Sequence, residues 1–319
     1  MKIKAGIIGG AGYTAGELIR LLIHHPQVKI VFVHSLSNAG NPVTDIHGGL
    51  IGETDLTFSE QFDLTRIDVL FLCSGHGDGR KFVEMTAIPA PVKLIDLSAD
   101  YRCRATADGF IYGLPELNRH LIRTAGRIAN PGCFATSIQL ALLPLADKKL
   151  LQNEIHIHAI TGSTGAGFKP CATSHFAWRD NNISAYKVFE HQHLAEICES
   201  LDCEQSQINF IPIRGNFSRG IFASVYTECD LNLKEATQIY RDFYRDAAFT
   251  FICDLNIDMK QAVNTNKCIL HLVKHGNKLL ILSVIDNLLK GASGQAVQNM
   301  NLMFGLDEKM GLGLKGSAF

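Results

Sequence analysis

The first third of the chain alternates short apolar runs with amphipathic helical patterns. One helical pattern, GELIRLLIHH, follows the first apolar run, and the apolar runs are contained in KAGIIGG, KIVFVHSLS, DVLFLCSG and VKLIDLSAD. Continuous apolar runs are typical of strands that are buried on both faces, as in a parallel sheet that helices cover on both sides. We therefore expect an α/β fold that begins with a doubly wound parallel sheet.

The pattern changes after residue 150. Apolar and polar residues alternate there in EIHIHAITG, FASVYTECDL and KCILHLVKHGNKLLILSVIDN, and the HGN within the last of these is typical of a hairpin turn. Helical patterns are few, apart from LKEATQIYRDFYRDAAF and a final ASGQAVQNMNLMF. Because such alternation is typical of antiparallel strands, we expect a second, α+β domain. A chain of 319 residues is also long for one hydrophobic core.

Charge and cysteine content narrow the choice of partner and compartment. The 30 Lys and Arg residues are nearly balanced by 31 Asp and Glu residues, so no excess charge attracts nucleic acid or an anionic membrane. No apolar segment approaches the roughly 20 residues of a membrane span, and the N-terminus does not resemble a signal peptide. Nine cysteines without C-x-x-C spacing favour a reduced compartment. We expect a cytoplasmic protein that acts on a small molecule, without a nucleic-acid or membrane partner.

Three glycines, Gly9, Gly10 and Gly12, lie between the first apolar run and the first helical pattern. This order lets backbone N–H groups at a helix N-terminus approach a pyrophosphate. A tight strand-to-helix turn without a ligand is the alternative. Ser35 and Ser37 follow the second apolar run, where no Asp or Glu is present to bind a ribose diol. That absence favours a 2′-phosphate and therefore NADPH.

An Asn-Pro-Gly turn precedes Cys133 and an apolar helical pattern that runs over 137–145. A helix N-terminus lowers the pKa of a thiol, which is ordinarily about 8.5, so Cys133 is placed to be a nucleophilic thiolate. The alternative is a buried cysteine that behaves as a small apolar residue. We expect that second role for the other eight cysteines: Cys73, Cys103, Cys171, Cys198, Cys203, Cys229, Cys253 and Cys268.

A thiol nucleophile needs a proton carrier, and the densest histidine pair of the chain is His191 and His193, followed by Glu196. Two histidines could also bind a metal ion, but no further ligands with suitable spacing lie near them, so we expect no metal. His156 and His158 lie two residues apart in an expected strand, where they would form part of a polar face.

Eight motifs, in order, resemble those of one known family. The resemblance runs from residue 6 to about residue 305, and its motifs are GAGYTAGEL, DLSADYR, YGLPEL, NPGC, TGSTGAG, YKVFEHQH, SRGI and DNLLKGASGQAVQNMN. These stretches resemble the motifs of the N-acyl-gamma-glutamyl-phosphate reductases, enzymes of the third step of arginine biosynthesis. One such motif would be a weak indication, whereas eight in the same order are highly specific.

The resemblance implies an architecture like that of glyceraldehyde-phosphate and aspartate-semialdehyde dehydrogenases. Residues 1–132 would form a Rossmann domain that binds NADPH, completed by the C-terminal helix of 291–319. Residues 133–290 would form an α+β catalytic and dimerisation domain of a homodimer or homotetramer. The implied reaction is the NADPH-dependent reductive dephosphorylation of N-acetyl-gamma-glutamyl phosphate to the 5-semialdehyde. Cys133 would form a thioester, with His193, rather than His191, as the acid–base.

The same resemblance implies binding residues. Tyr13 and Thr14 would bind the cofactor with the glycines, and Asn287 and Gly291 would lie near the nicotinamide, with a plain helix cap as the alternative. Guanidinium groups match the geometry of a phosphate or a carboxylate, although each arginine is equally compatible with a surface role. The candidate substrate-binding residues are Arg102, Asn130, Arg214 and Arg219.

Two features depart from the family pattern. Phe134 and Ala135 follow the thiol where Tyr-Pro is frequent in the family, and the stretch IPIRGNFSRGI is longer than usual. Both bear on the substrate pocket, so an N-succinyl substrate and an aspartate-semialdehyde-type dehydrogenase are kept as alternatives. A non-catalytic NADPH-sensing module with the same fold is the alternative from another functional class.

Overall fold

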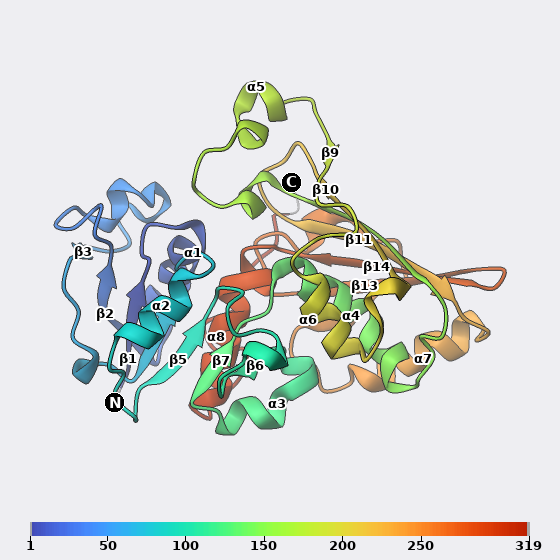
Figure 1. Cartoon of the computed structure of the whole chain (residues 1–319), viewed down its shortest axis with the longest axis horizontal. Coiled ribbons are helices and arrows are strands. Elements are labelled where there is room, and N and C mark those ends of the chain that lie inside the picture. The colour runs from blue at the N-terminus through green and yellow to red at the C-terminus, as the bar shows by residue number, and fades with distance from the viewer. Residues whose placement is uncertain (1, 318–319) are drawn as a thin grey trace. The chain divides into compact units, whose positions relative to one another are not determined.

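The computed structural model of the chain describes residues 2–317 (Figure 1). These residues divide into two compact units. The first contains the chain up to Pro131 together with Ala292–Gly313, and the second contains Gly132–Gly291 and the residues from Leu314 onward. The assignment of 1–132 with 291–319 to a cofactor-binding domain, and of 133–290 to a catalytic domain, stays a prediction.

The first unit is built on a seven-stranded sheet in which every neighbouring pair of strands is parallel. The strand order is β3-β2-β1-β4-β5-β7-β6, so the chain reverses its direction of travel across the sheet between β1 and β4. In doubly wound sheets such a reversal is where ligands bind. The strands are β1 (Ile3–Ile8), β2 (Val28–His34), β3 (Phe58–Ser59), β4 (Val69–Leu72), β5 (Lys93–Asp96), β6 (Ile111–Tyr112) and β7 (Arg127–Ala129).

The helices of the first unit are α1 (Tyr13–Ile23), α2 (Asp78–Met85), α3 (Pro115–Thr124) and α8 (Gly294–Met303). Helix α8 packs against α1 and α3, although it comes from the far end of the chain. All ten of its residues are buried, and three of its polar side chains, those of Gln298, Asn299 and Asn301, bond inside the unit. For example, the Asn299 amide donates to the Gly113 carbonyl oxygen at 2.8 Å.

The second unit is built on a seven-stranded mixed sheet in the order β12-β13-β14-β11-β8-β10-β9. The pairs β8/β10 and β12/β13 are parallel, and the other four are antiparallel. The predicted hairpin is confirmed, because β13 and β14 pair around the turn after His275. The strands are β8 (Ile155–Thr161), β9 (Ser184–Ala185), β10 (Ile208–Arg214), β11 (Ile221–Glu228), β12 (Thr250–Ile252), β13 (Cys268–His275) and β14 (Lys278–Ile285).

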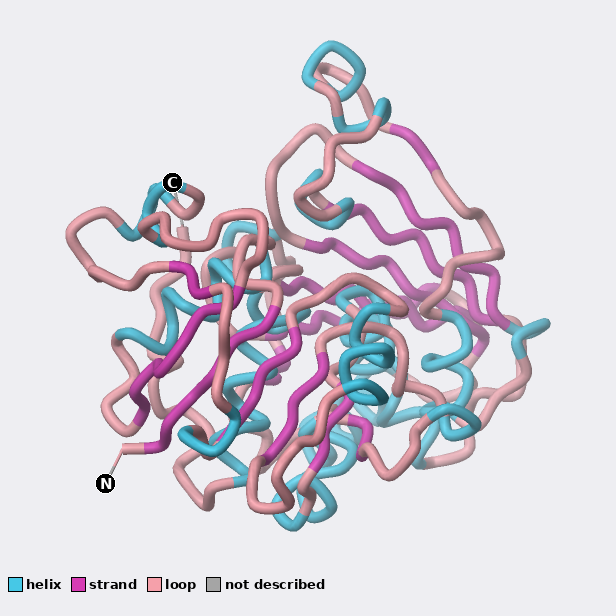
Figure 2. The backbone as a smooth tube through the Cα atoms, turned by 60° about the vertical axis from the view of Figure 1, so that its left-hand side comes forward, coloured by secondary structure: helices cyan, strands magenta, loops and turns pink. Residues whose placement is uncertain are grey.

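Helices cover one face of this second sheet. Figures 1 and 2 both place α4 (Cys133–Asp147), α6 (Leu194–Leu201) and α7 (Leu233–Phe243) on the same side of the strands, and α4 packs directly on β11 and β14. Burial alternates strictly along β8, β10 and β11, since the side chains toward the helices are buried and the others are partly exposed. The short helix α5 (Phe176–Arg179) lies in a long loop between β8 and β9.

The two sheets confirm the predicted fold class, an α/β chain with a doubly wound parallel sheet and a second α+β part. Within residues 2–317, no helix is both long enough and apolar enough to cross a membrane. The expectation for the eight remaining cysteines is wrong for Cys171, which is exposed, whereas Cys229 and Cys268 are buried and the other five are partly exposed. Cys171 is exposed because it lies in the loop between β8 and β9, away from either core.

Candidate active site

Cys133 is the first residue of α4. The N-cap is Gly132, which has no side chain to accept a hydrogen bond from the first turn of the helix. The helix itself is buried from Phe134 to Leu145, whereas Cys133 is partly exposed. No side chain caps this first turn, and the partial positive charge of a helix N-terminus favours an anionic sulfur at this place.

The imidazole of His193 packs directly against the turn that precedes Cys133. A Cβ atom on Gly132 would lie 2.4 Å from His193 Nε2 and 2.7 Å from Glu196 Oε1. Real Cβ atoms do not come so close to other heavy atoms, so only glycine permits this approach. The glycine of the NPGC motif is therefore required for the nucleophile and the imidazole to be neighbours.

Glu196 is a buried carboxylate that the sequence left without a role. Its Oε2 accepts a hydrogen bond from the Gly132 N–H at 3.1 Å, and its Oε1 lies 3.9 Å from His193 Nε2. The side chain amide of Gln139, from α4, also donates to the Glu196 carbonyl oxygen at 2.9 Å. Glu196 thus connects the imidazole to the backbone beside the nucleophile. Its position three residues after His193, on the same helical face, is the signal that could have indicated this role.

His191 lies behind His193 in an aromatic cluster. Its ring makes edge-on contacts with Phe134 and Phe210, and its Nδ1 accepts a hydrogen bond from the His193 N–H at 3.2 Å. Burial, followed by the charge of His193, lowers the pKa of His191 to about 3. A ring with this pKa does not form the imidazolium at physiological pH and is a poor general acid. Because His193, and not His191, packs against the turn before Cys133, His193 is favoured as the acid–base.

Phe134 belongs to the same cluster and does not line an open pocket. Its side chain is only 1% exposed and contacts the rings of both histidines. Phe134, which departs from the family pattern after the thiol, therefore packs behind the two imidazoles. Its effect on substrate choice would act through the position of those rings.

Arg214 and Arg219 differ in how their charges are balanced. Arg219 forms a bidentate ion pair with the fully buried Asp286, at 2.9 and 3.0 Å. Arg214 is also buried, but no described carboxylate lies within ion-pair distance of it, and its guanidinium lies over the ring of Tyr186. A buried cation without a counterion is costly unless a ligand provides one, so Arg214 is the stronger candidate for an anion receptor.

Arg102 and Asn130 form backbone contacts within the first unit. Arg102 donates to the carbonyl oxygens of Asn130 at 2.8 Å and Leu97 at 2.9 Å. The Asn130 amide donates to the Ala292 carbonyl oxygen at 3.0 Å and accepts from Asn299 at 3.1 Å. These bonds give both side chains a role in holding loops, and their contact with substrate stays a prediction.

Neither Asn287 nor Gly291 is the N-cap of α8, which is Ser293. Asn287 accepts from the Gly220 N–H at 2.7 Å and donates to the Thr164 hydroxyl at 3.0 Å. A Cβ on Gly291 would lie 2.8 Å from the Cβ of Cys133, so glycine is needed for the chain to pass the nucleophile. Their contact with a nicotinamide stays a prediction.

The glycine loop of the first unit fits a pyrophosphate. Gly9 has a positive φ of 80°, and a Cβ on Gly10 would lie 2.4 Å from Val33 Cγ1, so both positions require glycine. Gly12 is the N-cap of α1, no side chain caps this helix, and the nearest atom to a Cβ there is 3.8 Å away. The first turn, which contains Tyr13 and Thr14, therefore presents N–H groups to an anion.

Ser35 and Ser37 lie just after the C-terminal end of β2. Their hydroxyls are 3.5 Å apart, and the Asn38 amide donates to them at 3.2 and 3.0 Å. This cluster is polar and uncharged, and it contains hydroxyl and amide donors that match a phosphate as well as a ribose. In the described part of the chain, no group of three or more His, Cys, Asp or Glu residues is placed to hold a metal ion.

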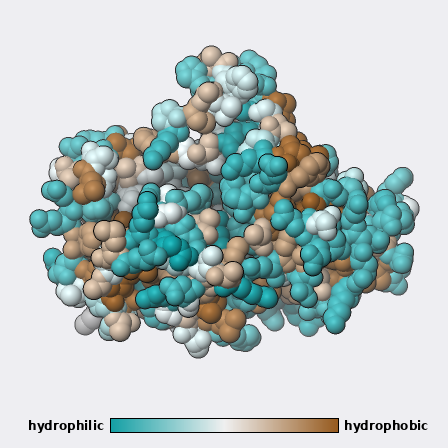
Figure 3. Space-filling view, in the orientation of Figure 1, coloured by the Kyte–Doolittle hydropathy of each residue, from teal (hydrophilic) through white to brown (hydrophobic). Residues whose placement is uncertain are grey.

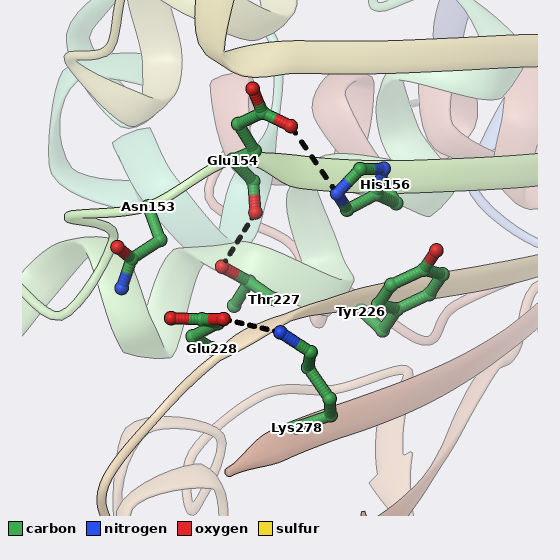
Figure 4. Close-up of a pocket in the computed structure, with 7 residues that line it drawn as sticks. All are labelled: Asn153, Glu154, His156, Tyr226, Thr227, Glu228 and Lys278. Atoms are coloured by element: carbon green, nitrogen blue, oxygen red, sulfur yellow. Dashed lines mark hydrogen bonds and ion pairs between the residues drawn. The ribbon is translucent and has the colours of Figure 1, made fainter.

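A separate pocket of about 340 Å³ lies at the other end of the second sheet (Figure 4). Glu154 precedes β8, Glu228 ends β11 and Lys278 begins β14, whereas Arg214 and Arg219 lie near the opposite ends of these strands. The pocket contains two ion pairs, Glu154 with His156 and Glu228 with Lys278, and no cysteine. It is not part of the cluster around Cys133.

Comparison with known proteins agrees with the division of the chain into two units. Residues 4–125 match the family model described as "Semialdehyde dehydrogenase, NAD binding domain", and residues 133–287 match "Semialdehyde dehydrogenase, dimerisation domain". The chain belongs to the semialdehyde dehydrogenase family and is an oxidoreductase with a nicotinamide-binding part.

The chain is highly similar to enzymes of one name within that family. The chain is 68% identical over 317 residues to an N-acetyl-gamma-glutamyl-phosphate reductase of Azobacteroides pseudotrichonymphae. The aligned residues cover 99% of this chain and all of the relative. The chain is 62% identical over 321 residues to the enzyme of the same name from Parabacteroides distasonis, with the same coverage.

Solved structures share the fold at much lower identity. Aspartate semialdehyde dehydrogenase II from Vibrio cholerae superposes with a TM-score of 0.76 at 17% identity, covering 96% of this chain and 99% of that one. A probable aspartate-semialdehyde dehydrogenase from Pseudomonas aeruginosa gives 0.74 at 15% identity, with 95% and 99% covered. At these identities the likeness shows the architecture alone.

Proposed function

We propose that the chain reduces N-acetyl-gamma-glutamyl phosphate to N-acetyl-glutamate 5-semialdehyde and releases phosphate, using NADPH, in the third step of arginine biosynthesis. The names of the relatives support the substrate. The observation that carries the chemistry is the partly exposed thiol of Cys133 at an uncapped helix N-terminus, beside the imidazole of His193.

Cys133 acts as the nucleophile in this proposal. Its sulfur attacks the γ-carbonyl carbon, the bond from that carbon to the phosphate oxygen breaks, and a thioester forms. The developing oxyanion is stabilised by backbone N–H groups in the first turn of α4, because Gly132 leaves them without a side-chain cap.

His193 manages the proton. It takes the proton from the thiol as the sulfur attacks, and it returns that proton to the oxyanion that is left when the thioester is reduced. It then removes the hydroxyl proton when the hemithioacetal breaks down to aldehyde and thiolate. Glu196 orients this ring through its carboxylate, whose Oε1 lies 3.9 Å from His193 Nε2. The residue is only 3% exposed, so the contact is shielded from solvent.

Arg214 binds an anionic group of the substrate, either its carboxylate or its phosphate. The missing counterion of this buried guanidinium supports the assignment. Arg219 holds the loop that ends at Gly220 through its ion pair with Asp286.

The cofactor is NADPH, held by the glycine loop and the first turn of α1. A bound nicotinamide supplies the hydride that reduces the thioester. Ser35 and Ser37 are proposed to bind the 2′-phosphate, because hydroxyl and amide donors are present there and no acidic residue lies within 28–40.

The chain is proposed to work as a homo-oligomer, which the family description of its second part supports. The face of the second sheet that the helices leave open includes Ile160 of β8, Ile211 and Ile213 of β10, and Leu280 of β14, all partly exposed. Figure 3 shows hydrophobic surface, in brown, beside strands β9 to β11. We assign this open face to a homodimer contact, because paired sheet faces bury such side chains.

The test is the reverse reaction, which uses stable reagents. Purified protein is given N-acetyl-glutamate 5-semialdehyde, phosphate and NADP⁺, and reduction of the nicotinamide is followed by absorbance. The N-succinyl semialdehyde, aspartate semialdehyde and NAD⁺ are run in parallel. Preference for the acetyl substrate with NADP⁺ supports the proposal. Preference for aspartate semialdehyde, or the absence of turnover with every substrate, would contradict it.

A further inference from the structure

Tyr186 lies between two groups of the candidate active site. The Cζ atom of Arg214 is 4.6 Å from the centroid of its ring. On another side the ring meets His191, with centroids 5.8 Å apart and planes at 69°. The ring therefore separates a buried cation from a buried neutral imidazole.

The backbone around Tyr186 is held by bonds that do not involve its side chain. Its N–H donates to the Pro212 carbonyl oxygen at 3.1 Å, which joins this segment to β10 two residues before Arg214. The neighbouring β9 pairs with the end of β10, with Ser184 opposite Arg214. The position of the ring over the guanidinium is thus set by strand pairing, and a change of side chain at Tyr186 leaves that pairing available.

Arg179, in the same loop, holds the backbone of Arg214. Its guanidinium is 5% exposed and donates to the Arg214 carbonyl oxygen at 2.8 Å, to the Thr173 carbonyl oxygen at 3.0 Å and to the Ser184 hydroxyl at 3.0 Å. All of these acceptors are uncharged. Arg179 therefore adds a second positive charge near Arg214 instead of neutralising it.

The local arrangement keeps the charge of Arg214 available. A ring face attracts a guanidinium but contributes no formal negative charge, so the cation is oriented without being neutralised. Burial raises the pKa of Tyr186, and the phenol therefore stays neutral over the physiological range. A carboxylate in the same place would neutralise the guanidinium and compete with an anionic ligand.

We propose that Tyr186 is a positioning residue that orients the Arg214 guanidinium to bind the anionic group of the substrate. The segment from Arg179 to Tyr186, which contains β9, thereby controls substrate affinity, although it contributes no group to the covalent steps. This inference rests on the proposed function, in which Arg214 is the substrate anion receptor.

The experiment compares Tyr186→Phe, which keeps the ring, with Tyr186→Leu, which removes it. The Leu variant is expected to raise KM for the acyl-glutamate semialdehyde about tenfold with kcat changed by less than about threefold, because the guanidinium loses its orienting face. The Phe variant is expected to stay within about twofold of wild type in both constants. Phe176→Leu, at a site 78% exposed in the same loop, is the matched control.

Two further measurements separate positioning from general damage. Calorimetric titration with N-acetyl-glutamate should show the same loss of affinity in the Leu variant, and the NMR signal of Arg214 Nε should lose its ring-current shift in Leu but not in Phe. A double-mutant cycle with Arg214→Lys should show that Tyr186→Leu has little further effect once the guanidinium is absent. If the Leu variant does not fold, Tyr186→Met replaces it.

The outcomes are distinct. An unchanged KM in a folded Leu or Met variant would overturn the positioning role while leaving the proposed function intact. A loss of kcat in Tyr186→Phe would show that the hydroxyl takes part in the chemistry, which also contradicts the proposal. If wild-type protein turns over none of the acyl-glutamate substrates, the proposed function itself fails, and this result is seen before any variant is compared.

Discussion

The imidazole of His193 and the backbone of Gly132 touch so closely that a Cβ on Gly132 would lie 2.4 Å from Nε2. The two residues belong to different elements, since Gly132 is the N-cap of α4 and His193 is the N-cap of α6. The contact brings the imidazole to the turn that carries the nucleophile, and it leaves no space for a larger residue. The relative position of the Cys133 turn and the His193 imidazole therefore depends on the missing side chain at Gly132.

Gly132→Ala is expected to reduce kcat by at least about 10²-fold, because the added methyl group displaces the imidazole and the Glu196 carboxylate. Steady-state kinetics with the semialdehyde check this. Gly126→Ala is the control, since nothing lies within 4 Å of a Cβ at that position. Equal loss of activity in both variants would show that the contact has no specific role.

Cys133→Ala should abolish turnover and leave NADPH binding, measured by fluorescence, unchanged. In wild type, iodoacetamide is expected to label two sites, because hydrogen bonds from the Ser174 and Thr173 hydroxyls lower the pKa of the exposed Cys171 to about 7. Substrate should protect Cys133 and not Cys171, as read by peptide mass mapping. Labelling is therefore best carried out in a Cys171→Ser background, and a Cys133→Ala variant with near-normal rates would refute the thioester.

Glu196→Gln is expected to lower kcat by about 10- to 100-fold without unfolding the protein. The amide oxygen still accepts the Gly132 N–H, but the negative charge beside His193 is lost. Glu196→Ala should in addition lower Tm, because the buried N–H is then left without an acceptor. Kinetics and thermal unfolding measure the two effects, and full activity in the Gln variant would argue against the role of the charge.

His191→Asn should retain far more activity than His193→Asn in steady-state kinetics, since the pKa of His191, lowered to about 3, keeps its ring neutral.

The lowered pKa of His191 also makes the stability of the fold depend on pH. The unfolded chain binds a proton at His191 below about pH 6.5 and the folded chain does not, so stability contributed by the neutral ring is lost as pH falls from about 6.5 toward 3. Denaturant unfolding at several pH values should give a shallower pH dependence for His191→Asn than for wild type.

Ile211→Asp is expected to dissociate the proposed homodimer, because it places a charge on the open sheet face, in the middle of β10. Sedimentation velocity of wild type and variant measures the change in mass. Ile51→Asp is the control, since Ile51 is 75% exposed and lies outside the second sheet. An unchanged oligomer in the Ile211 variant would place the contact elsewhere.

Most of the architecture could be predicted from local pattern. Short apolar runs indicated the buried parallel strands, alternation indicated β8, β11 and the β13/β14 hairpin, and the Asn-Pro-Gly turn indicated Cys133 at the start of a helix. The pattern placed the start of that helical run at 137, whereas α4 begins at Cys133. Helix boundaries depend on capping and packing as well as on apolar spacing.

The sequence by itself determined the fold class, the family and the thiol at a helix N-terminus, because periodicity, turn residues and ordered motifs are local properties of the chain. Tertiary structure alone decided that Glu196 bonds to Gly132 across 64 residues, that Asp286 neutralises Arg219, and that Tyr186 covers Arg214. These roles depend on which distant side chains come within a few ångströms of each other. Strand pairing and helix packing determine such distances, and residue spacing along the chain does not reveal them.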